Sequence, residues 1–175
     1  MPTLSEYLAF KAHRMAALRE NLAAPDAAPA SLRAVARVAD GSGVRPVRIR
    51  EFTIVTDSAP ALAGYNLGPT APELLLASLA SCLAHTYLIV AANRGMRFET
   101  LEVEVSGQID FRGVLEVMPD APIAPFGLTY LARVSGDVSD NELRRIQKDV
   151  ERLCPVFRAL VEPVAVSGRV ERTVQ

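Results

Sequence analysis

The sequence predicts a single domain of the α+β class, with its elements in the order β-β-α-β-β-α-β rather than in strict β-α-β alternation. Three observations support this fold class. Several segments alternate apolar and polar residues, as half-buried strands do. Thr70 and Ser139 are each followed three residues later by Glu, which is the capping-box spacing of a helix start. The chain has 175 residues, half of them hydrophobic, which is enough for one buried core.

The first 30 residues are expected to form an added helix and a linker. Apolar residues recur at helical spacing from Leu4 to Leu22. The stretch 21–30 is rich in Ala and Pro, and Pro25 should stop the helix. We therefore divide the chain into an N-terminal helix with its linker, residues 1–30, and a main domain, residues 31–175.

The main domain begins with two predicted antiparallel strands, Ser31–Ala39 and Val47–Thr56, which are joined through the turn sequence DGSG at Asp40–Gly43. On the second strand, Arg48 and Arg50 fall on one partly apolar face. Two guanidinium groups on such a face are either solvated charges or part of a functional site.

A loop, Asp57–Gly68, leads to the most apolar segment of the chain. This segment is predicted to be a helix that Thr70 and Glu73 cap at its start and Gly95 ends in the left-handed conformation. Its stretch Leu74–Ala92 is about as long as a bilayer span. However, it contains Ser, Cys, His and Thr side chains, which favour a long buried central helix over a membrane span.

Two further strands are predicted around Leu101–Val105 and Leu128–Val134, with an irregular, proline-containing loop between them. Ser139 begins a second capping box and an amphipathic helix. Pro155 must end that helix or begin a new turn. Valines in Val164–Val170 predict a last strand.

Composition and motifs exclude several classes of function. The formal net charge of -1 provides no basic field for nucleic acid. There is no glycine-rich phosphate motif, and the two histidines and two cysteines have no metal-ligand spacing, so we expect neither a bound metal nor a cofactor. The start of the chain lacks the pattern of a secretory signal, which favours a cytoplasmic protein that does not interact with a membrane. Thiol chemistry is what remains.

Cys82 and Cys154 are the candidate functional residues. In a reducing compartment the pair is either two buried thiols or a redox couple. Cys82 lies in the middle of the central helix, on a face with the small polar residues Ser78 and Thr86. Cys154 directly precedes Pro155, at a position resembling a helix N-cap, where backbone N–H groups would lower the thiol pKa. Alternatively, Cys154 simply caps the preceding helix.

The segment GPTAPELLLASLASC, Gly68–Cys82, together with the CPV of Cys154–Val156, resembles the OsmC and Ohr family of thiol peroxidases that detoxify organic hydroperoxides. The resemblance runs from Ser31 to the C-terminus, and Ala71 replaces a usual proline. It implies an OsmC-like fold assembled as an intertwined homodimer, with sheets built from both subunits and active sites at the subunit interface.

The resemblance also implies roles for individual residues. Cys82 would be the peroxidatic thiol and Cys154 the resolving thiol. An arginine holds the first thiolate in this family, and we carry this role over to Arg50, with Arg48 as the alternative. Glu73 would be the carboxylate that orients the arginine. The implied substrate is an organic hydroperoxide, and the implied reductant is an external dithiol, with lipoyl proteins as the donors expected in the family.

Two questions stay open at this point. Glu73 precedes Cys82 by nine residues, which places it about 13 Å away along the helix axis and on the opposite side of the helix. Glu73 therefore either serves a site completed by a second subunit or only closes the capping box with Thr70. In the Ohr and OsmC proteins proper, this glutamate stands one residue further from the cysteine. The protein could also be a ligand-binding or redox-sensing dimer of the same fold, with thiols that are not catalytic.

Overall fold

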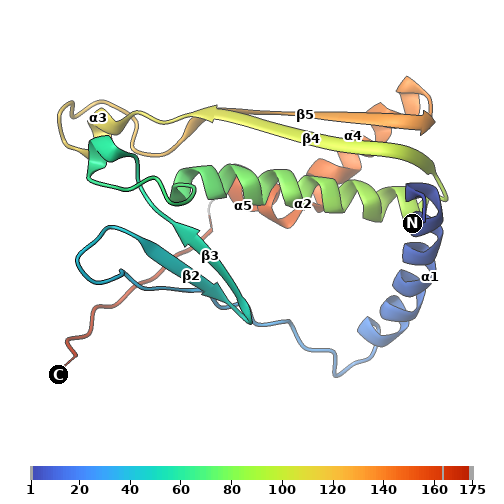
Figure 1. Cartoon of the computed structure of the whole chain (residues 1–175). Helices are drawn as coiled ribbons and strands as arrows, with labels where there is room; N and C mark the ends of the chain where they lie inside the picture. Colours follow the sequence, from blue (N-terminus) through green and yellow to red (C-terminus); the bar gives the residue numbers. More distant parts are fainter. Residues whose placement is uncertain (1, 163, 174–175) are drawn as a thin grey trace.

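The computed structural model describes residues 2–162 and 164–173, and it has the predicted α+β architecture. Figure 1 shows a long central helix with a two-stranded sheet along it and a hairpin that extends away from one end. In chain order the elements are α1 (Leu4–Leu22), β1 (Val35–Ala36), β2 (Arg45–Ile49), β3 (Phe52–Thr56), the 3-10 turn η1 (Pro60–Leu62), α2 (Ala71–Asn93), β4 (Arg97–Gln108), α3 (Phe111–Val114), β5 (Phe126–Asp137), α4 (Asp140–Leu153) and α5 (Pro155–Val161).

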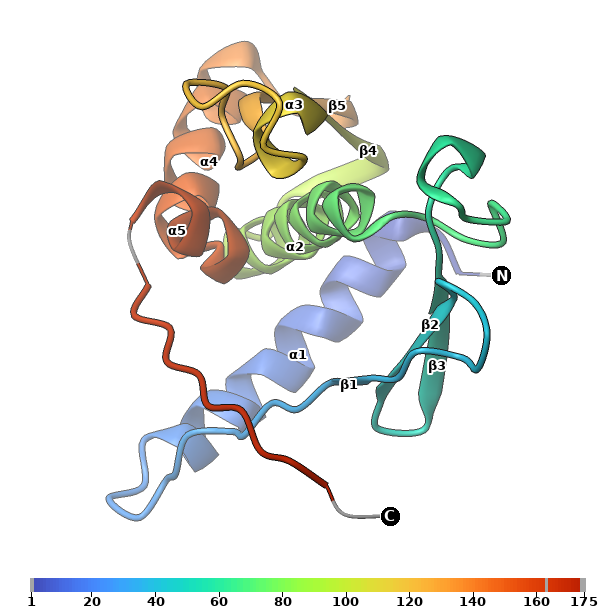
Figure 2. The same cartoon turned by 90° about the vertical axis from the view of Figure 1, so that its left-hand side faces the viewer.

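The central helix α2 is the element around which the others are arranged (Figures 1 and 2). The sheet of β4 and β5 packs along one side of it, α4 and α5 pack on another side, and α1 packs near its C-terminal end. Leu83 of α2, Phe98 of β4, and Ile146 and Val150 of α4 are fully buried in one core cluster. The core is therefore built between α2 and the C-terminal half of the chain.

The starts of α2 and α4 have the predicted capping boxes, and α1 has one that the sequence analysis missed. Each of the three long helices begins with a complete capping box, in which the side chains of the cap residue and of the Glu satisfy each other's backbone N–H. The helix α2 ends at Arg94, and Gly95 follows with a φ of 63°, as predicted. The capping pairs are Thr3 with Glu6, Thr70 with Glu73, and Ser139 with Glu142.

The strands β4 and β5 form a long antiparallel pair, with Val103 opposite Ala132 and Val105 opposite Tyr130. Both are longer than the sequence pattern indicates. The irregular connection between them contains one short helix that the sequence analysis missed, α3, whose start is capped by Asp110. Pro155 begins the separate helix α5, which resolves the choice left open for that residue.

The single strand predicted over Val47–Thr56 is wrong. The segment forms the hairpin of β2 and β3, joined by a two-residue turn at Arg50 and Glu51. Arg50 has a φ of 54°, a left-handed conformation that Gly and Asn adopt more readily, so the sequence carries no turn signal here. The strand predicted over Ser31–Ala39 shrinks to the two residues of β1, although it does pair antiparallel with β2.

The last predicted strand, Val164–Val170, is also not formed. The described residues 164–173 have no regular secondary structure, and Val166 and Val170 are 91% and 100% exposed. Figure 2 shows this segment leaving α5 as an extended coil. Alternating valines favour an extended backbone, but a strand also needs a partner strand, and none of the described strands pairs with this segment.

The helix α2 is not covered all round, although its composition predicts an interior helix. Ala77, Ser78, Ser81 and His85 remain exposed along one face. By length and composition α2 could also span a membrane, but its other faces pack on β4, α4 and α1. An open face on such an apolar helix is typical of a surface that meets another subunit.

The degree of burial predicts which leucines contribute most to the free energy of unfolding. Leu83→Ala should lower the free energy of unfolding by about 2–5 kcal/mol, because it leaves a cavity where a fully buried side chain stood. Leu131→Ala on the outer face of β5, where the side chain is 52% exposed, should cost less than about 1 kcal/mol. Urea denaturation of the reduced proteins, followed by circular dichroism, measures both. Equal losses would contradict this placement of the core.

Candidate thiol site

The structure brings Cys82 and Cys154 together from distant parts of the sequence. Cys82 lies in the middle of α2, and Cys154 lies at the junction of α4 and α5, which both pack against α2. The two thiols lie close enough for Cys154 to raise the pKa of Cys82, and neither forms a disulfide. Cys154 is fully buried, whereas Cys82 keeps part of its surface exposed. This arrangement suits a redox couple in which only the first thiol is open to a reagent.

The start of α5 gives each sulfur a backbone N–H neighbour. Cys154 ends α4 and caps α5, with the extended backbone that a following proline favours. The N–H of Phe157 donates to the Cys154 Sγ at 3.5 Å. The N–H of Val156 interacts instead with the thiol of Cys82 and lowers its pKa. The N-cap position predicted for Cys154 therefore also brings a backbone N–H group close to Cys82.

Burial nevertheless raises the pKa of the Cys82 thiol above its ordinary value. The neighbouring Cys154 thiol raises this pKa further, while the Val156 N–H and the Thr86 side chain lower it by less. None of the causes of this shift is a basic side chain among the described residues. Within one chain, Cys82 is therefore a protonated thiol at neutral pH, and a cation that would lower its pKa would have to come from elsewhere.

Arg50 and Arg48 do not provide that cation within the same chain. Arg50 is exposed in the turn between β2 and β3, where its guanidinium lies over the Phe52 ring, 5.2 Å from the ring centre. Arg48 is exposed on β2, opposite Thr53. Figure 1 shows this hairpin extending away from α2. The two arginines are thus displayed on an arm rather than directed at the chain's own thiols.

Glu73 closes the capping box at the start of α2. Its carboxylate accepts from the N–H and the hydroxyl of Thr70, at 2.7 and 2.8 Å. These hydrogen bonds lower the pKa of Glu73, which is therefore ionised at neutral pH. Since α2 is continuous from Ala71 to Asn93, Glu73 stays at the far end of the helix from Cys82 of the same chain.

Glu73 also lines an apolar pocket of about 490 Å³ that the sequence analysis missed. The pocket lies between the loop that precedes α2, the end of β4 and the short helix α3. Its volume falls in the range of small-molecule sites, and its walls can receive an apolar group. No sequence signal joins these segments, which only tertiary packing brings together. The apolar lining residues are Leu62, Pro72, Leu76, Ile109, Phe111, Leu115 and Pro125.

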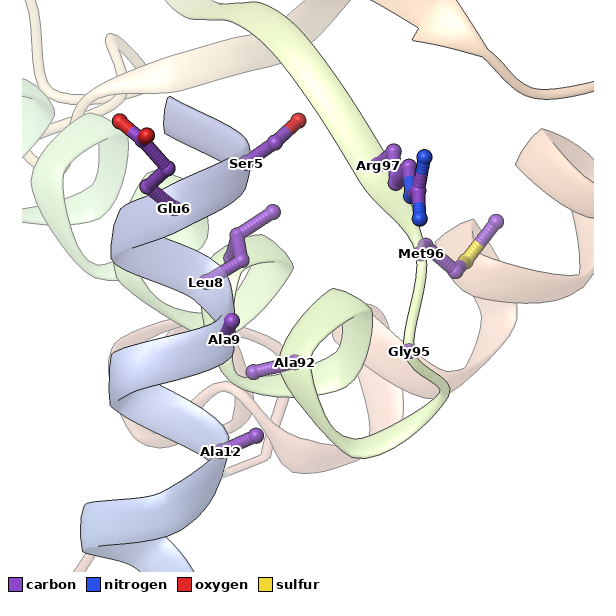
Figure 3. Close-up of a pocket in the computed structure, with 9 residues that line it drawn as sticks. All are labelled: Ser5, Glu6, Leu8, Ala9, Ala12, Ala92, Gly95, Met96 and Arg97. Atoms are coloured by element: carbon purple, nitrogen blue, oxygen red, sulfur yellow. The ribbon is translucent and has the colours of Figure 1, made fainter. Parts of the chain in front are cut away.

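Another hollow, of about 530 Å³, lies between α1 and the turn from α2 to β4. Figure 3 shows Ala12 and Ala92 facing one another across it, with Glu6 pointing away from Arg97. Neither cysteine lines this hollow, so it is separate from the thiol site. Within residues 2–162 and 164–173, no group of three or more His, Cys, Asp or Glu side chains is arranged to hold a metal ion.

A family model described as OsmC-like protein matches residues 64–167. The chain belongs to the OsmC-like family. The resemblance drawn from Gly68–Cys82 and the distant Cys-Pro pair is thereby confirmed. The matched region begins at Gly64, just after η1, and includes both cysteines, α2, β4, α3, β5, α4 and α5. The helix α1 and the hairpin of β2 and β3 lie outside it.

Solved structures confirm the fold. An OsmC-like protein from Mycoplasma pneumoniae aligns over 78% of this chain and 91% of its own, with 18% identity and a TM-score of 0.67. An organic hydroperoxide resistance protein OsmC from Legionella pneumophila aligns over 76% and 90%, with 18% identity and a TM-score of 0.57. The organic hydroperoxide resistance protein OhrB of Bacillus subtilis aligns over 75% and 91%, with 20% identity and a TM-score of 0.51. No curated protein sequence matches the chain.

The proximity of the two thiols predicts an internal disulfide. Diamide, which oxidises dithiols, should convert the reduced protein to a form with no free thiol and no covalent link between chains. Cys154→Ser should give no internal disulfide, since Cys82 then lacks its neighbour. Thiol titration, intact-mass measurement and non-reducing gels test this expectation. Disulfide-linked dimers as the main product from the wild-type protein would contradict it.

Proposed function

We propose that this OsmC-like protein is a thiol-dependent peroxidase that reduces organic hydroperoxides. The observation that carries the proposal is the proximity of a partly exposed thiol, Cys82, to a buried one, Cys154. Membership of the OsmC-like family supports it, as does a fold shared with proteins named for organic hydroperoxide resistance. The apolar pocket beside Glu73 supports an organic substrate rather than hydrogen peroxide.

The reaction runs in two steps. The Cys82 thiolate attacks one oxygen of the hydroperoxide, so that an S–O bond forms and the O–O bond breaks. Sulfur is oxidised to the sulfenic acid, and the departing alkoxide takes up a proton to become an alcohol. The Cys154 sulfur then attacks the sulfenic sulfur, water leaves and a disulfide forms. An external dithiol reduces that disulfide, and a lipoyl protein is the donor we propose.

Exposure assigns the two roles. A hydroperoxide must reach the attacking sulfur, and Cys154 is 0% exposed, whereas Cys82 is only partly buried. Cys154 sits at the break between two helices, where the α5 turn can shift as the disulfide forms. Cys82 is therefore the peroxidatic residue and Cys154 the resolving residue in this proposal.

The proposal includes a homodimer with composite sites. The raised pKa of Cys82 calls for a cation, and the arginines of the chain's own hairpin do not supply it. An open face of α2 lies beside Cys82, and the hairpin with Arg50 extends from the molecule as an arm (Figure 1). A second copy packed on that face would place its Arg50, or Arg48, together with its Glu73 near Cys82. This arrangement also gives Glu73 a role beyond capping.

Peroxide consumption tests the two thiol roles. Wild-type protein with a dithiol should turn over cumene hydroperoxide, and Cys82→Ser should lose this activity by about a thousandfold, because no other thiol is exposed to attack. Cys154→Ser should consume one equivalent and then stall with Cys82 over-oxidised, as mass spectrometry would show. If both variants react like the wild type, the peroxidase proposal is wrong, and the ligand-binding or redox-sensing alternative takes its place.

Mixed dimers test the composite site. One chain carries Cys82→Ser, and the other carries Arg50→Ala with Glu73→Gln. Each variant alone should be inactive or nearly so, and a heterodimer purified with two different tags should regain up to about half of the wild-type rate, because one complete site forms. Sedimentation should show dimers throughout. A heterodimer with no recovered activity would show that Cys82, Arg50 and Glu73 do not meet across an interface.

A further inference from the structure

Asp57 is a buried carboxylate that the thiol chemistry does not use. It follows β3 directly and is 0% exposed. One carboxylate oxygen, Oδ2, accepts from the N–H of Tyr65 at 2.8 Å and from the N–H of Leu67 at 3.1 Å. The other oxygen, Oδ1, is buried and has no partner among the described residues. A carboxylate is costly to bury, so its interactions with the groups around it must compensate for that cost.

The loop 58–69 folds around this carboxylate. The N–H of Asp57 donates to the carbonyl of Pro69, so both ends of the loop meet at this residue. The Ser58 N–H contributes most to lowering the pKa of Asp57, and the N–H groups of Leu67 and Tyr65 add to it against the opposing effect of burial. The carboxylate is therefore ionised at neutral pH and acts as a common acceptor for N–H groups from both halves of the loop.

Two glycines let the loop pack tightly against neighbouring backbone. A Cβ added at Gly64 would lie 1.9 Å from the Ser58 carbonyl oxygen, and one added at Gly68 would lie 2.1 Å from that of Val55. Arg45 of β2 donates to the Ser58 hydroxyl at 3.4 Å and lowers the pKa of Asp57. The loop is thus fixed to the hairpin on one side and to the start of α2 on the other.

The same loop forms one wall of the apolar pocket beside Glu73. Ala59, Ala61 and Leu62 come from it, and Thr70 and Glu73 follow it directly. We infer that Asp57 is a positioning residue, whose buried carboxylate holds the loop 58–69 closed so that this pocket is preformed for the organic group of the hydroperoxide. The inference rests on the proposed function for the nature of the occupant, an uncharged apolar hydroperoxide or the alcohol made from it.

The first test measures binding without turnover. The probe is cumyl alcohol, the product of cumene hydroperoxide reduction, added to the Cys82→Ser protein. Its binding is followed by methyl NMR signals of Leu62, Ile109 and Leu115. Asp57→Asn keeps the shape of the side chain but turns an acceptor into a partial donor facing N–H groups. It should weaken binding by about tenfold, whereas Asp120→Asn, at an exposed loop position, should leave it unchanged.

The second test separates positioning from a purely structural role. With Cys82 intact, Asp57→Asn should raise the KM for cumene hydroperoxide by about tenfold and leave kcat and the rate with hydrogen peroxide within about twofold, because hydrogen peroxide has no organic group for the pocket. Hydrogen exchange should speed up at Tyr65 and Leu67 but not in α4. Gly64→Ala should have the same effects, since it opens the loop with the carboxylate in place.

The outcomes are distinct for the two proposals. If the wild-type protein binds cumyl alcohol in the pocket and Asp57→Asn or Gly64→Ala weakens binding, the inference stands even when no hydroperoxide is turned over, and only the proposed function fails. If cumyl alcohol does not shift the pocket signals, or if faster exchange at Tyr65 leaves binding and KM unchanged, Asp57 does not position this pocket.

Discussion

The covering of α2 is the constraint on which the rest of the structure depends. This helix has 23 residues and only one charged side chain, Glu73, so water is a poor environment for most of its surface. The pair of β4 and β5 covers one side, and the amphipathic α4 covers another with Ile146 and Val150. Because these elements come later in the chain, burying α2 forces the C-terminal half to wrap back over it.

This wrapping also creates the thiol pair. The same packing that places α4 on α2 brings the end of α4, with Cys154, onto the middle of α2, where Cys82 lies. Pro155 then ends the α4 hydrogen-bond ladder and opens α5, whose first N–H groups are free to meet sulfur. Tyr130 of β5 packs against Phe157 of α5 and donates to Glu151 of α4, which ties both helices to the sheet. Hydrophobic burial and the chemistry of the site are therefore consequences of one arrangement.

The electrostatic environment differs between the middle of α2 and its N-terminal end. Burial favours the neutral thiol at Cys82, while hydrogen bonds favour the charged carboxylates of Glu73 and Asp57 at the other end of α2. The cations of the hairpin are held on an exposed arm, connected to the Asp57 loop through Arg45. An isolated chain thus keeps Cys82, its candidate nucleophile, and its candidate activator apart. A site assembled from two chains would be active only in the complete assembly.

The sequence by itself determined the elements whose signals are local. The capping boxes at Thr70 and Ser139 and the left-handed Gly95 each depend on neighbouring residues, and each appears as predicted. At Pro155 the sequence left two outcomes open, and the structure has the start of a new helix. Tertiary structure alone decided the hairpin turn at Arg50, which carries no turn residue, and left Val164–Val170 without a partner strand among the described residues. It also decided the apolar pocket and the buried environment of Cys82, because burial and pKa depend on residues far away in the sequence.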